Sequence, residues 1–114
     1  MLVCVYGTLR AGCSNHRLLE GSEFLGSVSV DGWAMYSMGG FPALVPAVGL
    51  AISGEVYRVT EAVMKTLDRL EGYPGWYDRT EVPTEFGDAW IYHFTDQAAV
   101  VGRRLIQSGD WKCA

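Results

Sequence analysis

The sequence predicts an α+β domain whose small mixed sheet is strongly curved or closed into a barrel-like shape. Three observations lead to this fold class: several short β-rich runs, one well-defined helix, and the lack of any repeat, linker or low-complexity segment in 114 residues. Roughly five to seven strands are expected around that helix. In so small a chain, a closed sheet removes exposed strand edges. One domain over residues 1–114 is therefore expected.

The chain opens with a short apolar run that stops at a glycine. The run Leu2–Val5 is followed by Tyr6 and Gly7. A short apolar run bounded by a breaker predicts a buried strand. Gly7 would allow unusual dihedral angles and the close approach of a ligand to the backbone N–H groups of the loop. Residues 14–21 then predict a helix of one or two turns that ends at a glycine.

The middle of the chain carries four strand patterns. Asp31-Gly32 separates the first two, and this turn signal predicts a hairpin. Prolines bracket the third run, which makes it an edge strand or an extended loop. Gly54 interrupts the fourth and predicts a bulge or a close backbone contact. The four runs are residues 24–30, 33–36, 43–46 and 50–59.

The best-defined helix covers Glu61–Glu71. Thr60 is a suitable N-cap, and Gly72 follows the last helical residue. The elements expected after the helix are a turn at 73–76, strands at 77–85 and 89–94, and an irregular tail at 95–114.

Glu71 occupies an informative position on this helix. At about 100° per residue, Val63, Leu67 and Leu70 form an apolar stripe. Glu71 falls at the edge of the stripe, between the directions of Leu67 and Met64. Partial burial and the negative end of the helix dipole both raise a carboxyl pKa, which suits a general acid/base near neutral pH. The alternative is a helix-end glutamate that is turned toward water.

The composition excludes several classes of function. The net charge is −4, and no Lys/Arg cluster exceeds the pair Arg103-Arg104, so nucleic-acid binding is not expected. Neither a leader pattern nor an apolar run that spans a bilayer is present, so no membrane association is expected. The three cysteines are odd in number and form no C-x-x-C pair. A disulfide framework is therefore not expected, and a cytoplasmic location is the default.

Cysteine and histidine side chains offer competing sites. The candidates for a metal site are Cys4, Cys13, His16 and Cys113. Their spacing matches no structural zinc pattern, so no metal is expected. Cys13 near His16 suggests a nucleophile with its base, although a plain loop thiol is favoured. His93 is expected to be a half-exposed strand residue.

Four short patterns along the chain point to one protein family. Two are Val5-Tyr6-Gly7-Thr8-Leu9-Arg10 and Leu67-Asp68-x-x-Glu71-Gly72-Tyr73. The others are Tyr77-x-Arg79 and Ser108-Gly109-Asp110-Trp111. In this order they resemble the gamma-glutamylcyclotransferase-like family, in its small, avirulence-induced-protein type. The first pattern is similar to that family's Y-G-[ST]-L signature, and the second is similar to the segment that carries its acidic catalytic residue.

The resemblance implies a barrel-like mixed fold with a cavity, and a specific reaction. In that reaction the α-amine of a γ-glutamyl group attacks its own γ-carbonyl, and 5-oxoproline and a free amine are released. Such an α-amine is mostly an ammonium at neutral pH, so it needs a base, and no cofactor or metal is required. The implied site residues are Glu71 as the general acid/base, Tyr6, Gly7, Thr8 and Leu9 as the substrate-binding loop, and Asn15, Tyr77 and Arg79 as further candidate pocket residues.

The expected partner is a small-molecule γ-glutamyl substrate, and the expected assembly is a monomer or a homodimer. For Tyr77 and Arg79, a packed ring and an ordinary ion pair are equally good interpretations. Two other functions stay open. One is a non-catalytic module of the same fold that binds a small carboxylate or amine, and the other is an interaction protein with a vestigial pocket.

Overall fold

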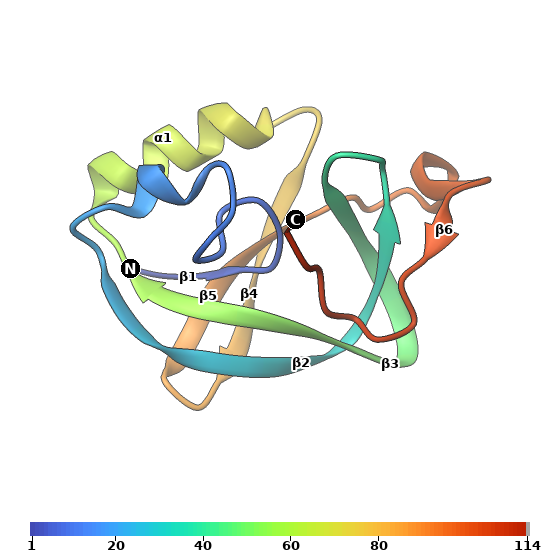
Figure 1. The fold of residues 1–114 in the computed structure, drawn as a ribbon, viewed down its shortest axis with the longest axis horizontal. Coiled ribbons are helices and arrows are strands. Elements are labelled where there is room, and N and C mark those ends of the chain that lie inside the picture. The colour runs from blue at the N-terminus through green and yellow to red at the C-terminus, as the bar shows by residue number, and fades with distance from the viewer. Residues whose placement is uncertain (114) are drawn as a thin grey trace.

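A six-stranded sheet curls around the molecule, and one α-helix lies across its open side (Figure 1). This computed structural model describes residues 1–113. The strand order is β4-β5-β1-β3-β2-β6, in which β1 runs parallel to β5 and antiparallel to β3. The elements are β1 (Leu2–Val5), η1 (His16–Leu19), β2 (Glu23–Ser37), β3 (Pro42–Arg58), α1 (Glu61–Glu71), β4 (Asp78–Thr84), β5 (Gly87–His93), η2 (Gln97–Val100) and β6 (Arg104–Leu105). The predicted fold class is confirmed in its curved form, since β4 and β6 are the edges of this sheet.

The N-terminal strand is central and is buried on both faces. Neighbouring side chains of a strand point to opposite faces. Val3 and Val5 accordingly join the apolar cluster that includes Leu67 of α1. Cys4 and Tyr6 join the cluster on the other face. Burial on both faces fixes β1, and it therefore fixes the start of the loop that follows.

The hairpin predicted at Asp31-Gly32 is wrong. Strands β2 and β3 pair along nearly their whole lengths and form one long arched ribbon (Figure 1). Asp31-Gly32 lies inside β2, where the pairing shifts by one residue as in a β-bulge. Gly32 has a φ of 92°, which a bulge tolerates and which most other residues avoid. A turn signal and a bulge signal use the same residue types, and the pairing partner decides between them.

The proline-bracketed run 43–46 belongs to β3 and is therefore a strand. β2 pairs with it on one side, whereas β1 pairs with β3 only at Glu55–Arg58. On the other side of the run, the Leu44 carbonyl accepts a hydrogen bond from the Phe94 N–H at 2.8 Å. Residues Ala43, Leu44 and Val45 are fully buried. Gly54, further along β3, has no bulge next to it. A Cβ atom there would lie 2.5 Å from the Cys4 Sγ atom, so the glycine permits a close contact between strands.

Helix α1 has the predicted bounds and caps. The Thr60 Oγ1 atom accepts a hydrogen bond from the Val63 N–H at 3.2 Å, and Gly72 ends the helix in the left-handed conformation. The buried residues of α1 are Met64 and Leu67. Of the expected stripe of Val63, Leu67 and Leu70, only Leu67 is buried, and Leu70 is 38% exposed. Glu71 follows Leu67 by four positions and Met64 by seven, so it shares their face.

The C-terminal part contains a predicted hairpin and a tail with more order than expected. Strands β4 and β5 pair from Asp78↔His93 to Thr84↔Gly87, close to the predicted ranges. The tail contributes η2 and β6, and β6 pairs with β2. The Ser53 N–H then donates to the Gly109 carbonyl at 2.8 Å, so the tail also follows β3.

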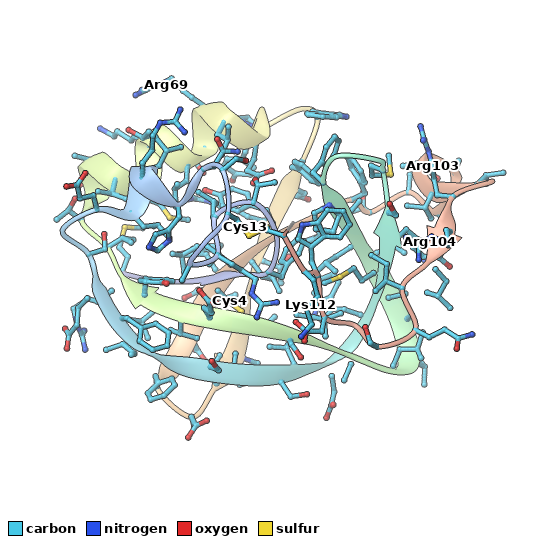
Figure 2. The ribbon with its side chains drawn as sticks, viewed as in Figure 1. Cys4, Cys13, Arg69, Arg103, Arg104 and Lys112 are labelled. Atoms are coloured by element: carbon cyan, nitrogen blue, oxygen red, sulfur yellow. A yellow bond between two sulfur atoms is a disulfide. The ribbon has the colours of Figure 1, made fainter. Side chains whose placement is uncertain are left out.

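The expectation that the cysteines carry no disulfide is wrong. Cys13 and Cys113 form a disulfide bond, and Cys4 is a buried free thiol. Figure 2 shows Cys13 beside the C-terminal segment that carries Lys112. The fold returns the tail to the N-terminal loop across 100 residues of sequence, which spacing alone does not reveal. The cytoplasmic location was predicted from the absence of a disulfide framework, and the Cys13–Cys113 bond does not support it. The location therefore stays an untested prediction. Within residues 1–113, no helix has the length and apolarity needed to cross a bilayer.

Candidate active site

The loop after β1 and the C-terminal end of α1 enclose a cavity of about 320 Å³. Seven of the eight predicted site residues line it together, and Arg79 is the exception. The lining residues are Cys4, Val5, Tyr6, Gly7, Thr8, Leu9, Ser14, Asn15, Gly40, Phe41, Pro42, Leu70, Glu71, Trp76, Tyr77 and Tyr92. The cavity wall therefore combines the Gly7–Leu9 loop, the carboxyl group of Glu71 and several aromatic rings.

Glu71 is the only Asp or Glu side chain that lines this cavity among the described residues. Burial raises the pKa of its carboxyl from the ordinary value of 4.5 to about 7. No cation within residues 1–113 forms an ion pair with it, so nothing offsets the cost of desolvating the charge. A carboxyl group with this pKa can both accept and donate a proton near neutral pH.

The raised pKa of Glu71 predicts a pH-dependent cost in stability. Because ionisation is harder in the folded state, stability falls as the pH rises from about 4.5 to about 7, and it stays lower above that range. Glu71→Gln removes this cost, so we expect the variant to gain on the order of 3 kcal/mol relative to wild type between pH 4 and pH 8. Urea denaturation at both pH values measures the difference. Glu61→Gln, at the exposed start of the same helix, is the matched control. An equal wild-type-to-variant difference at both pH values would contradict the shift.

Gly7 is required for space and not for its dihedral angles. Its φ lies outside the left-handed region, so the expected unusual conformation is wrong. A Cβ atom at this position would lie 2.7 Å from Cγ and 2.8 Å from Cδ of Pro42. Pro42 begins β3 and lines the same cavity. The absence of a side chain at Gly7 therefore lets the loop pack directly on the start of β3.

Hydrogen bonds hold the loop in one shape. The Asn15 side chain donates to the Thr8 Oγ1 atom at 2.9 Å, and the Asn15 N–H donates to the Thr8 carbonyl at 2.8 Å. The Arg10 N–H donates to the Gly7 carbonyl at 3.0 Å. No acceptor within residues 1–113 receives the N–H groups of Gly7, Thr8 and Leu9. A run of such N–H groups can bind a carboxylate or an oxyanion.

A partly buried charge cluster contacts the loop, and sequence reasoning missed it. The Arg10 guanidinium contacts the Glu55 carboxylate at 3.2 Å, the Asp110 carboxylate at 2.5 Å and the Trp111 carbonyl at 2.9 Å. Glu55 also accepts from the Ala11 N–H at 3.0 Å. Arg10 and Asp110 both belong to the family-like patterns in the sequence. Their pairing across 100 residues is visible only in the fold.

This cluster predicts a large effect of Arg10→Ala on stability. The substitution leaves the buried Glu55 carboxylate without its cation, and breaking such a pair typically costs about 3 kcal/mol. Chemical denaturation at pH 7 measures the change. Arg58→Ala breaks a matched but exposed pair with Glu23, and we expect less than about 1 kcal/mol there. A similar loss in the free energy of unfolding for the two variants would show that the Arg10 ion pairs stabilise the fold no more than an exposed pair does.

Two of the tyrosines that line the cavity are neutral groups. The Tyr6 hydroxyl donates to the Tyr92 carbonyl at 2.7 Å, and the Tyr77 hydroxyl donates to the Pro42 carbonyl at 3.4 Å. Burial raises the pKa of each phenol well above its ordinary value, and the nearby charge of Glu71 raises it further. Both therefore stay protonated over the range in which Glu71 titrates.

Arg79 holds the helix against the sheet and lies outside the cavity lining. Its guanidinium contacts the Asp68 carboxylate at 3.1 Å and lies 4.6 Å from the ring centroids of both Tyr73 and Trp90. Asp68 also accepts from the Tyr92 hydroxyl at 2.7 Å. These contacts fix the turn of α1 that precedes Glu71.

The competing cysteine and histidine sites are not assembled. Cys13 is held in the disulfide, and the His16 Nδ1 atom lies 3.0 Å from the Leu9 carbonyl oxygen. His93 was expected to be half-exposed, but it is buried at 3% exposure, and its ring lies 4.8 Å from the ring of Trp33 on β2. Its Nε2 atom lies 2.8 Å from the Thr80 Oγ1 atom.

Comparison with known proteins assigns the chain to a protein family. A family model described as "Gamma-glutamyl cyclotransferase, AIG2-like" matches residues 3–113. The chain belongs to this family. YtfP from Escherichia coli K12, a gamma-glutamylcyclotransferase family protein, is 40% identical over 111 residues, and the match covers 97% of this chain and 96% of YtfP. A relative from Vibrio cholerae is 43% identical over 111 residues, covering 96% and 94% of the two chains.

The solved structures agree with the family. The crystal structure of PH0828 from Pyrococcus horikoshii superimposes with a TM-score of 0.82 at 32% identity, covering 96% of this chain and 88% of PH0828. The family resemblance and the enzyme class predicted from the sequence are thereby confirmed, and the chain is an enzyme of the gamma-glutamylcyclotransferase type.

Proposed function

We propose that this single-domain enzyme releases 5-oxoproline from γ-glutamyl amines, with Glu71 as its general acid/base. One observation carries the proposal: a carboxyl group with a pKa near 7 and a loop with unoccupied N–H groups line the same small cavity. These are the two kinds of group that the reaction needs, one for proton transfer and one for the developing negative charge.

In the proposed first step, the substrate's α-ammonium transfers a proton to the Glu71 carboxylate. The freed amine nitrogen attacks the γ-carbonyl carbon, and a C–N bond closes a five-membered ring. The carbonyl oxygen becomes an oxyanion that accepts hydrogen bonds from the backbone N–H groups of Gly7, Thr8 and Leu9. Because the attack is intramolecular, the site mainly has to hold a folded conformer of the substrate.

In the second step, the protonated Glu71 donates its proton to the nitrogen of the leaving amine. The original γ-amide C–N bond breaks, and the oxyanion returns to a carbonyl. The ring nitrogen still carries two protons after the attack, so it gives one of them to the restored Glu71 carboxylate, which passes it to the departing amine. The products are 5-oxoproline and the amine as its ammonium ion, and Glu71 is again an ionised carboxylate. A pKa near 7 suits both transfers, because neither protonation state is strongly favoured at neutral pH.

The experiment that tests this proposal is an assay of the purified protein with a panel of γ-glutamyl amines and γ-glutamyl dipeptides. Release of 5-oxoproline with an equal amount of free amine supports it. Release of glutamate would instead indicate hydrolysis. An absence of any product, together with binding of a γ-glutamyl compound, would favour the non-catalytic binding module.

A further inference from the structure

An apolar surface at the mouth of the cavity has no role in the proposed proton transfers. Trp76 and Leu70 both line the cavity, and they are 58% and 38% exposed. Leu70 immediately precedes Glu71, and Trp76 follows the turn after α1. A ligand group that covers these two side chains would remove apolar surface from water, which favours binding.

Packing holds the Trp76 ring in place. It lies 5.9 Å from the Phe41 ring at 73° and 5.3 Å from the Tyr77 ring. The Trp76 N–H donates to the Gly72 carbonyl at 2.9 Å, which ties its backbone to the end of α1. The indole is therefore a preorganised wall, and a ligand group that contacts it does not have to order it first.

The charges of the cavity oppose a second carboxylate on the ligand. No Lys, Arg or His side chain is among the described residues that line it, and Glu71 is the one carboxyl group. Arg10 is already paired with Glu55 and Asp110, and Arg79 is paired with Asp68. In the proposed reaction, the N–H groups of the Gly7–Leu9 loop donate hydrogen bonds to the γ-glutamyl half of the substrate, so they do not bind the leaving amine. A carboxylate on the leaving amine would lose its hydration without gaining a cation.

We propose that Trp76, Phe41 and Leu70 form a leaving-group subsite that selects uncharged amines with an aromatic or aliphatic substituent. This inference rests on the proposed function, because the subsite receives the half of the substrate that departs as the free amine. The substituent covers the exposed indole, while the γ-glutamyl half lies against the Gly7–Leu9 loop.

Three substrates test the inference. The amide of γ-glutamate with phenethylamine differs from γ-glutamyl-phenylalanine only by a carboxylate, and γ-glutamyl-methylamide lacks the ring. We expect kcat/KM for the phenethylamide to exceed both others about tenfold. Trp76→Ala should lower kcat/KM about tenfold for the phenethylamide and less than about twofold for the methylamide. Phe86→Ala, an exposed aromatic that does not line the cavity, should change neither.

Equal kcat/KM for the phenethylamide and γ-glutamyl-phenylalanine would overturn the subsite, as would an equal loss for all substrates in Trp76→Ala. If none of the three releases 5-oxoproline, the proposed function fails, and binding then tests the subsite separately. Calorimetry with the Glu71→Gln variant should still give tighter binding of the phenethylamide than of γ-glutamyl-phenylalanine. Equal dissociation constants there would overturn the inference independently of turnover.

Discussion

Glu71→Gln should lose 5-oxoproline release by about 10²- to 10⁴-fold while the protein stays folded. Glutamine keeps the size of the side chain but can neither take the proton from the α-ammonium nor return it to the leaving amine. Because the carboxyl group carries a desolvation cost at neutral pH, the variant should also be at least as stable as wild type. The measurement is kcat for the best γ-glutamyl amine at pH 7.

The control for this loss is Glu61→Gln. Glu61 lies at the other end of α1 and its side chain is exposed, so the same chemical substitution is made there without touching the cavity. Turnover by this variant should stay within about twofold of wild type. Comparable turnover by Glu71→Gln and wild type would contradict the assigned role of Glu71.

Gly7→Ala should impair both folding and turnover. The added methyl group meets the Pro42 ring at 2.7 Å, and a proline ring has little freedom to move aside. We expect a loss of about 1–3 kcal/mol in stability and about 100-fold in kcat/KM, because the N–H groups that follow are displaced. Denaturation and turnover measured well below the melting temperature separate the two effects.

Two variants sharpen the test of Gly7. At Gly40, an added Cβ meets no atom within 4 Å, so Gly40→Ala should change the free energy of unfolding by less than about 0.5 kcal/mol. Replacing Pro42 by alanine in the Gly7→Ala background removes the clash and should recover part of the stability. No recovery in the double variant would show that the Pro42 contact is not the cause.

The sequence predicts best those elements whose signals are local. Helix α1 has a capping residue, an amphipathic pattern and a terminal glycine within about a dozen positions, and its bounds agree with the structure. The Asp31-Gly32 signal failed because a bulge in a long strand and a turn between two short ones use the same residues. Only the pairing with β3 distinguishes a bulge from a turn, because β3 pairs with the residues on both sides of Asp31-Gly32.

The candidate site could be predicted only in part. Family-like patterns and helix periodicity indicated the cavity residues, and the structure brings Tyr6, Gly7 and Glu71 to one cavity. The Arg10 cluster and the Cys13–Cys113 bond join residues about a hundred positions apart, so no local spacing reveals them. Arg79 was a candidate pocket residue, but in the fold it forms an ion pair with Asp68. This pairing arises because the C-terminal half of α1 lies close to β4, which carries Arg79.

The measurement that tests the central claim most directly is turnover of a γ-glutamyl amine in water enriched in ¹⁸O. Intramolecular attack by the α-amine uses no water, so the account predicts 5-oxoproline without ¹⁸O and no glutamate. Mass spectrometry reads both products from one reaction. Glutamate carrying one ¹⁸O atom would show that water is the nucleophile and would contradict the proposed cyclisation.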